Sequence, residues 1–284
     1  MIDILVGIDD SERGERALAW AARYAQRVRG NLTLVSVIDP GSARQLGLEV
    51  DAVDAAAQKA LDARRDRLAA EFPGVGVTTY VVQGKVVDEL VDAAAGHNMV
   101  VLGTHHVAGV SEAVGGAKAL RVSVSVNIPT VIVPADWTPD REGAGIVVGV
   151  GPDQVSENAV IFGVQEALRL GEPLELVSAW GLPPLLTLPA EAMGGGISPV
   201  GAQFQRKLDE RARLLRGSHP DLQVTGLAVE GPSPAKTLTN HARGHRMLVL
   251  GTHSRTVLGR ALFGSTVHAV LLNPSVPTVV VPLP

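Results

Sequence analysis

The chain contains one loop sequence twice. Residues 249–267 read VLGTHSRTVLGRALFGSTV, and residues 101–119 read VLGTHHVAGVSEAVGGAKA. The two stretches lie 249 − 101 = 148 positions apart and begin with the same Val-Leu-Gly-Thr-His. In each, an apolar run ends at a glycine, and a polar loop leads into a helical pattern, which is typical of an α/β fold. Repetition at a fixed offset indicates an internal duplication.

Other pairs of segments support the duplication. Pro129-Thr130-Val131 reappears at Pro277-Thr278-Val279 with the same offset, and Gly84 has its counterpart in Gly231. The stretch PADWTPDREGAG at residues 134–145 is rich in Pro, Gly and charge, as linkers are. We therefore predict a first domain at residues 1–136, a linker at 137–145 and a second domain at 146–284.

Composition narrows the function classes. The 284 residues are 46% hydrophobic, carry a formal charge of −4 without a conspicuous basic run, and include no cysteine. A basic face for nucleic acid is absent, and so are disulfides and thiolate ligands. The N-terminal stretch does not resemble a signal peptide, and no apolar run approaches the roughly 20 residues of a membrane span. We expect a cytoplasmic protein with no nucleic-acid or membrane partner.

Short β-branched runs alternate with longer amphipathic segments in each half. In the first half the runs are IDILVGI, NLTLVSVI, VTTYVVQ, MVVLGTH and TVIVPA, with helical patterns near residues 12–28, 52–71, 87–96 and 112–126. Unbroken Val/Ile/Leu strands indicate a parallel sheet that is buried on both faces. The predicted fold class is α/β: two tandem Rossmann-like domains, each a five-stranded parallel sheet with helices on both faces. The apolar last strands predict an internal pseudo-dimer, because pairing would cover their edges.

In such sheets ligands bind beyond the carboxyl ends of the strands. After the fourth strand of the second half, Gly251, Ser254, Gly264 and Ser265 surround a loop that leads into a helix. Glycines let backbone N–H groups approach a ligand, and a helix start favours anions. Two interpretations remain open: a phosphate cradle, or an ordinary turn in which Ser265 caps the last helix.

The spacing of these residues resembles the universal stress protein family. In that family Gly-x-x-Gly, nine residues, then Gly-Ser or Gly-Thr holds the ribose and phosphates of ATP. The second half reads Gly251-x-x-Ser254, nine residues, then Gly264-Ser265-Thr266, whereas the first reads Gly103-x-x-His106, nine residues, then Gly116-Ala117. The resemblance implies ATP as the ligand, with or without Mg²⁺, and nucleotide contacts by Gly251, Ser254, Gly264, Ser265 and Thr266.

The family also has an aspartate after its first strand that contacts the adenine end of the nucleotide. Asp9 matches it in the first half, with Val37 at a position near the base, whereas the second half has Gly151. The resemblance thus implies a weaker first-repeat site at Asp9, Val37, Gly103 and Gly116. For Asp9 the other interpretation is a helix cap. We expect at most one nucleotide per chain at micromolar-to-millimolar affinity, with phosphate held better by the second repeat.

The resemblance implies a stress-response binding or signalling protein whose adenine-nucleotide site is partly degenerate in both repeats. The alternative is an ATP-independent scaffold that acts through dimerisation and partner binding. No Gly-x-Ser-x-Gly elbow or ligand-spaced metal cluster is present, so we predict no catalytic residue, no metal and at most very slow ATP hydrolysis. A homo-oligomer is expected. The Pro/Gly-rich residues 181–200 are interpreted as a surface insertion or, alternatively, a lid.

Overall fold

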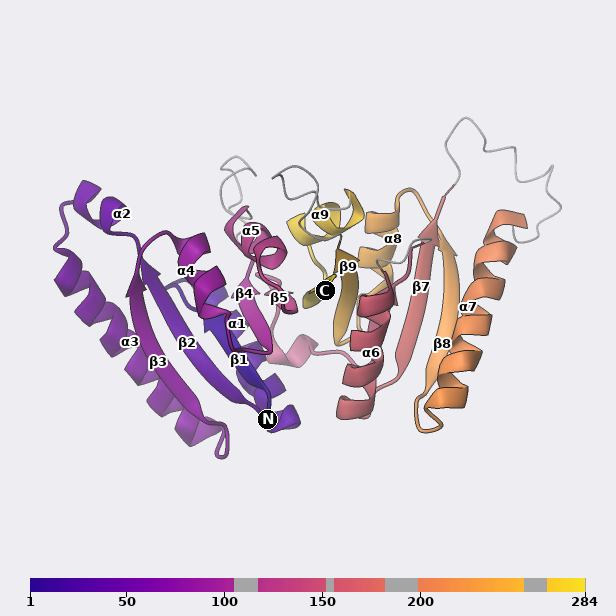
Figure 1. Cartoon of the computed structure of the whole chain (residues 1–284), viewed down its shortest axis with the longest axis horizontal. Coiled ribbons are helices and arrows are strands. Elements are labelled where there is room, and N and C mark those ends of the chain that lie inside the picture. Colours follow the sequence, from indigo (N-terminus) through magenta and orange to yellow (C-terminus); the bar gives the residue numbers. More distant parts are fainter. Residues whose placement is uncertain (105–116, 152–155, 182–198, 253–264, 284) are drawn as a thin grey trace. The chain divides into compact units, whose positions relative to one another are not determined.

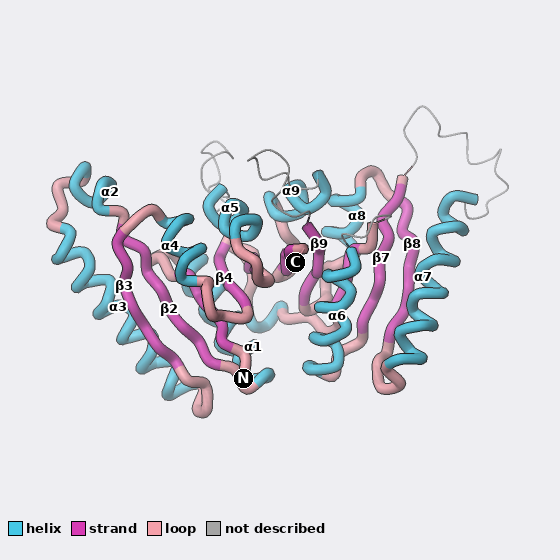
Figure 2. Tube along the Cα trace, viewed as in Figure 1, coloured by secondary structure: helices cyan, strands magenta, loops and turns pink. Residues whose placement is uncertain are grey.

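A computed structural model describes residues 1–104, 117–151, 156–181, 199–252 and 265–283. These residues form two compact units, Met1–Arg141 and the part that begins at Glu142. Within each unit the strands are parallel, and helices cover both faces of the sheet (Figures 1 and 2). The predicted α/β class and the two repeated domains are confirmed.

The sheet of the first unit has the strand order β3-β2-β1-β4-β5. The central strand β1 pairs with β2 on one side and with β4 on the other. Its five strands are β1 (Asp3–Gly7), β2 (Asn31–Ile38), β3 (Val77–Gln83), β4 (Met99–Gly103) and β5 (Thr130–Val133). The chain leaves β1 toward β2 and leaves β4 in the opposite direction toward β5. The switch point of the sheet therefore lies between β1 and β4.

Helices pack in pairs on the two faces of this sheet. The pair α1 (Glu12–Val28) and α3 (Val50–Glu71) lies on one face, and α4 (Val86–Ala93) and α5 (Ala117–Ser125) lie on the other (Figure 1). A short 3₁₀ helix, η1 (Pro139–Arg141), ends the unit. The arrangement follows from strands that are apolar on both sides, such as β1, in which Ile4, Leu5 and Val6 are fully buried.

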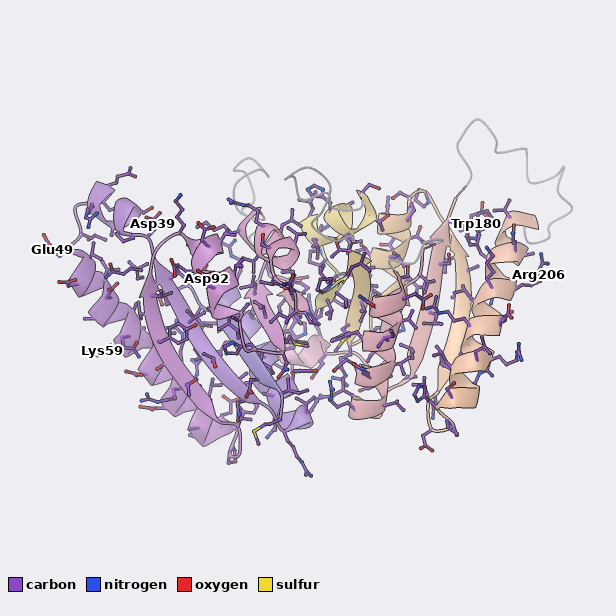
Figure 3. The ribbon with its side chains drawn as sticks, viewed as in Figure 1. Asp39, Glu49, Lys59, Asp92, Trp180 and Arg206 are labelled. Atoms are coloured by element: carbon purple, nitrogen blue, oxygen red, sulfur yellow. The ribbon has the colours of Figure 1, made fainter. Side chains whose placement is uncertain are left out.

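The structure adds one helix that the periodicity did not predict, α2 (Pro40–Gln45). Asp39, labelled in Figure 3 after the end of β2, caps it by accepting a hydrogen bond from the Gly41 N–H at 2.9 Å. Pro40 supplies a backbone angle suited to a first helical residue. The signal for this helix was therefore a capping pair rather than a hydrophobic period.

The second unit repeats the plan with the strand order β8-β7-β6-β9-β10. Its strands are β6 (Ile146–Gly149), β7 (Leu174–Trp180), β8 (Val224–Glu230), β9 (Met247–Thr252) and β10 (Thr278–Pro282). Its helices are α6 (Ser156–Leu170), α7 (Pro199–Ser218), α8 (Pro234–His241) and α9 (Ser265–Leu272). Ile146, Val147 and Val148 are fully buried, as their counterparts in β1 are.

Candidate functional site

A pocket of about 220 Å³ lies at the carboxyl ends of the strands in the first unit. Strands β1 and β4 both contribute to it, so it occupies the switch point of the sheet. Its walls combine aliphatic side chains with a few charged groups. The lining residues are Gly7, Ile8, Asp9, Arg13, Gly14, Val35, Val37, Val86, Leu90, Leu102, Gly103, Lys118 and Ala119.

Three of the residues that the sequence singled out, Asp9, Val37 and Gly103, come together in this pocket. Asp9 follows the end of β1, whereas Val37 and Gly103 belong to β2 and β4, and these three strands are adjacent in the sheet. Gly116, the fourth first-repeat candidate, lies outside the described residues. Aliphatic side chains give the pocket apolar walls, and Asp9 offers a hydrogen-bond acceptor at the rim.

The carboxylate of Asp9 is held by Ser11. Its Oδ1 accepts hydrogen bonds from the Ser11 hydroxyl at 2.5 Å and from the Ser11 N–H at 3.3 Å. Ser11 is the N-cap of α1, and its hydroxyl oxygen accepts from the Gly14 N–H at 3.2 Å. The capping role considered for Asp9 therefore belongs to Ser11. Asp9 Oδ2 makes no hydrogen bond within the described part of the chain.

Gly14 makes room for this arrangement and was missed by sequence reasoning. A Cβ at Gly14 would lie 2.6 Å from both the backbone oxygen and Oδ1 of Asp9. In the second unit the same position is Ser156, whose buried hydroxyl oxygen accepts from the Gly151 N–H at 2.7 Å. Thus Asp9 occurs with Gly14, and Gly151 occurs with Ser156. The signal available in the sequence was that both positions differ together between the two repeats.

Gly103 is required by packing within the protein. A Cβ there would lie 2.7 Å from the carbonyl oxygen of Arg13, a backbone atom in the first turn of α1. Gly7 is similarly enclosed by side chains, because a Cβ at this position would lie 2.6 Å from Leu102 Cδ2. The two glycines let β1, β4 and α1 approach each other, and so they set the shape of the pocket.

Two cationic residues, Arg13 and Lys118, also line the pocket and were not among the predicted site residues. Lys118 is exposed and belongs to α5. Its charge reaches Asp39, whose pKa is lowered chiefly by the hydrogen bond from the Gly41 N–H and then by those from Ser42, with Lys118 adding a smaller effect. Arg13 and Lys118 thus bring positive charge to the pocket, which also holds the carboxylate of Asp9.

In the second unit the structure describes only part of the predicted phosphate loop. Gly251 is half-buried in β9, Ser265 is exposed at the start of α9, and Thr266 follows it half-buried. Ser254 and Gly264 lie outside the described residues. Ala179, the counterpart of Val37, precedes Trp180 (labelled in Figure 3), whose ring stacks on Phe204 with centroids 6.4 Å apart.

The sequence model of the universal stress protein family matches the chain twice, at residues 2–134 and 145–282. A universal stress protein of Mycobacterium tuberculosis is 27% identical over 98% of this chain and 96% of its own length. Together the two matches span nearly the whole chain, one for each repeat. The family resemblance drawn from the loop spacing is confirmed.

Solved structures agree at the level of the fold. A universal stress protein from Archaeoglobus fulgidus superimposes with a TM-score of 0.74 at 13% identity, covering 98% of this chain and 97% of that one. One from Pseudomonas aeruginosa gives 0.64 at 19% identity, covering 99% and 92%. Within the described ranges no helix is both long and apolar enough to cross a membrane, and no cluster of side chains is suited to a metal ion.

Proposed function

This chain belongs to the universal stress protein family, and from that premise we propose that it is a stress-response binding protein with an adenine-nucleotide site. The single observation that carries the proposal is the first-unit pocket at the switch point, with Asp9 at its rim. Asp9 accepts hydrogen bonds, so its complement is a donor such as the exocyclic amine of adenine or a ribose hydroxyl.

The size and chemistry of the pocket favour a nucleoside. About 220 Å³ is below the roughly 300–1,000 Å³ of typical drug-sized sites, so adenosine fits better than a whole triphosphate. Val35, Val37 and Leu102 supply apolar wall for a flat base. Arg13 and Lys118 supply positive charge for a phosphate at the rim.

We propose that the second repeat binds the phosphates of ATP more strongly than the first repeat does. Gly251, Gly264 and Ser265 keep the family pattern there, with Arg255 and Arg260 in the same loop. The first repeat has His106 and Ala117 at the corresponding glycine and hydroxyl positions. Backbone N–H groups and a helix start bind phosphate without the base-side aspartate. The proposed stoichiometry is one nucleotide or fewer per chain.

Calorimetric titration of the full-length protein with adenosine and with ATP tests this assignment. Asp9→Ala removes a charged acceptor, and a hydrogen bond to a charged group contributes about 1.5–3 kcal/mol, so adenosine affinity is expected to fall about 10- to 100-fold. Asp10→Ala is the matched control, because Asp10 ion-pairs with Arg64 at 3.1 Å and does not line the pocket.

For ATP we expect the second-repeat variant, rather than the first-repeat variant, to weaken binding. Gly264→Val places a branched side chain where backbone must approach the phosphates, so ATP binding is expected to be largely lost. Asp9→Ala is expected to change ATP affinity little. If Asp9→Ala eliminates ATP binding and Gly264→Val is harmless, the phosphate site lies in the first repeat and the assignment is wrong.

A second candidate function, an ATP-independent scaffold, is favoured by the substitutions in both loops. His106 and Ser254 each place a side chain where the family has glycine, and Ala117 lacks the hydroxyl. Mass analysis of ligand that co-purifies with the protein separates the two functions. Absence of co-purified nucleotide together with no heat from either ligand would favour the scaffold.

A further inference from the structure

The outer helix layer of the second unit carries an open groove. It lies between α6 and α7 and has a volume of about 640 Å³. Three large apolar side chains on it are markedly exposed: Ile161 at 54%, Leu168 at 42% and Leu214 at 59%. Apolar side chains that gather on one exposed patch of a soluble protein mark an interaction surface.

The first unit provides an internal control, because α1 and α3 form the same layer there. That layer is bridged by ion pairs between the two helices. Glu15 accepts from Arg64 at 2.6 Å and from Arg67 at 2.7 Å, and Arg64 also reaches Asp10 at 3.1 Å. Within the described residues, neither α1 nor α3 carries a large exposed apolar side chain.

Aligning the two repeats shows what has changed. With the offset that relates Gly7 to Gly149, Ala19 and Gln26 of α1 correspond to Ile161 and Leu168. With the offset that relates Gly84 to Gly231, Arg67 of α3 corresponds to Leu214.

The pair Glu15–Arg64 is kept as Glu157–Arg211, whose side chains also form an ion pair. At three positions of this face the second unit thus has large apolar residues where the first has small or polar ones, while both units have the neighbouring ion pair.

We infer that this α6/α7 face binds the same face of a second copy of the chain. Ile161 and Leu214 line the groove and are more than half exposed, so each copy supplies both a hollow and apolar side chains available to a partner. An isologous two-fold contact requires this self-complementarity.

The charges at the groove favour a second copy over a strongly charged partner. The lining includes two acidic residues, Glu157 and Glu210, and two basic residues, Lys207 and Arg211. Their formal charges cancel. A second copy of this face therefore meets no net repulsion, and a strongly acidic or basic partner gains no net attraction. The occupant that suits a neutral, apolar and self-complementary face is the face itself.

The test uses the full-length chain, without nucleotide, so that its outcome is independent of the proposed binding function. Sedimentation equilibrium is expected to show a mass of about twice the 29.6 kDa chain for the wild type. The double variant Leu168→Gln/Leu214→Arg installs the first-repeat residues and is expected to weaken the dimer roughly 100-fold. The matched control Leu46→Gln/Leu272→Gln alters exposed leucines elsewhere and is expected to leave it unchanged.

A wild type that stays monomeric at the highest concentrations, or a dimer that the double variant leaves intact, would overturn the inference. Because the chain has no cysteine, Gln165→Cys gives an independent readout in the groove even if the double variant does not fold. A short bismaleimide is expected to cross-link Gln165→Cys into dimers but not Leu46→Cys. Absence of cross-linked dimer at Gln165→Cys would also overturn it.

Discussion

Different polar side chains lie at the amino ends of the strands in the two units. In the first unit the groups are mostly neutral. The Asn98 side-chain oxygen accepts from the Asp3 N–H at 2.9 Å, and the amide of Asn31 donates to the Asp3 carboxylate at 2.9 Å. One carboxylate and two amides thus satisfy the polar groups at this end.

In the second unit charged groups occupy the same place. Arg246, which corresponds to Asn98, hydrogen-bonds to Glu172 and to Glu142, and all three side chains are nearly buried. Glu172 also accepts from the Gly145 N–H at 2.6 Å, as Asn98 accepts from Asp3. The backbone geometry is retained, since the N–H of Arg246 and that of Asn98 donate to the oxygens of Gly145 and Asp3.

On the outer helix layers the contrast is reversed, with ion pairs in the first unit and apolar side chains in the second. The fold tolerates both exchanges because the central strands are aliphatic and fully buried in both units. The polar groups at the strand ends and on the helix surfaces thus differ between the repeats, whereas the central strands stay aliphatic in both. Each exchange can be tested by mutation.

The greatest loss of stability is expected at the network of Arg246, Glu142 and Glu172. Arg246→Met removes the cation that contacts both Glu142 and Glu172, whose side chains are each only 12% exposed. Breaking a buried ion network in this way costs about 3–5 kcal/mol. Urea unfolding, with hydrogen exchange of the β6 and β9 amides, measures the loss in the second unit. Asn98→Ala in the first unit is the control, with an expected loss of about 1 kcal/mol; equal losses would refute the contrast.

Gly103→Ala is expected to cause the second largest loss of stability. The new Cβ would lie 2.7 Å from the Arg13 carbonyl oxygen, so β4 and α1 must separate, at a cost of about 1–3 kcal/mol. Adenosine affinity is expected to fall as well, because Arg13 lines the pocket. Gly217→Ala is the control, since its Cβ meets nothing within 4 Å, and it should stabilise α7 by up to about 1 kcal/mol. No loss for Gly103→Ala would contradict the close approach.

Gly14→Ser gives the first unit the residue of the second. Its Cβ would clash with Asp9, so the aspartate must move away from Ser11. We expect roughly tenfold weaker adenosine binding, about 1.4 kcal/mol, measured by calorimetry. The double variant Asp9→Gly/Gly14→Ser, which matches the second unit at both positions, should recover stability without recovering adenosine binding. If Gly14→Ser binds adenosine normally, the coupling between these positions is absent.

The smallest effect concerns pH. Burial alone would raise the pKa of Glu15, but the hydrogen bonds and charges of Arg67 and Arg64 outweigh it and hold this pKa below its ordinary value. A depressed folded-state pKa contributes stability above the unfolded value of about 4.5, and this is lost as the pH falls through the folded value. Glu15 is partly exposed, so the contribution is at most about 1 kcal/mol.

Arg67→Leu introduces the leucine that the second repeat has at this position, Leu214. It should reduce the stability that the first unit loses as the pH falls. Urea unfolding at pH 7 and below pH 4.5 measures it. An unchanged pH dependence, with Arg64 still in place, would mean that Arg67 contributes nothing to the shift. Lys59→Leu, on the same helix, is the control for placing a leucine on α3, because Lys59 is not among the groups that shift the Glu15 pKa.

Much of the fold could be predicted because its signals are local. Runs of Val, Ile and Leu predicted the strands, and repeated loop sequences predicted the two units. The short α2 was missed because it rests on the cap by Asp39 rather than on a hydrophobic period. At the candidate site, Asp9, Val37 and Gly103 were found from the family spacing, but Arg13, Gly14 and Lys118 were not, because no spacing rule links them.

The residue pattern alone identifies a duplicated α/β protein, because apolar strands indicate burial on both faces and the repeated loop sequences indicate duplication. The roles of the loop residues, in contrast, follow from contacts in the folded protein. Gly103 faces the Arg13 carbonyl, and Ser11 rather than Asp9 caps α1. The exposed leucines of α6 and α7 also line one groove only because the two helices pack side by side. These roles depend on distances between segments far apart in the chain, and hydrophobic periodicity carries no information about such distances.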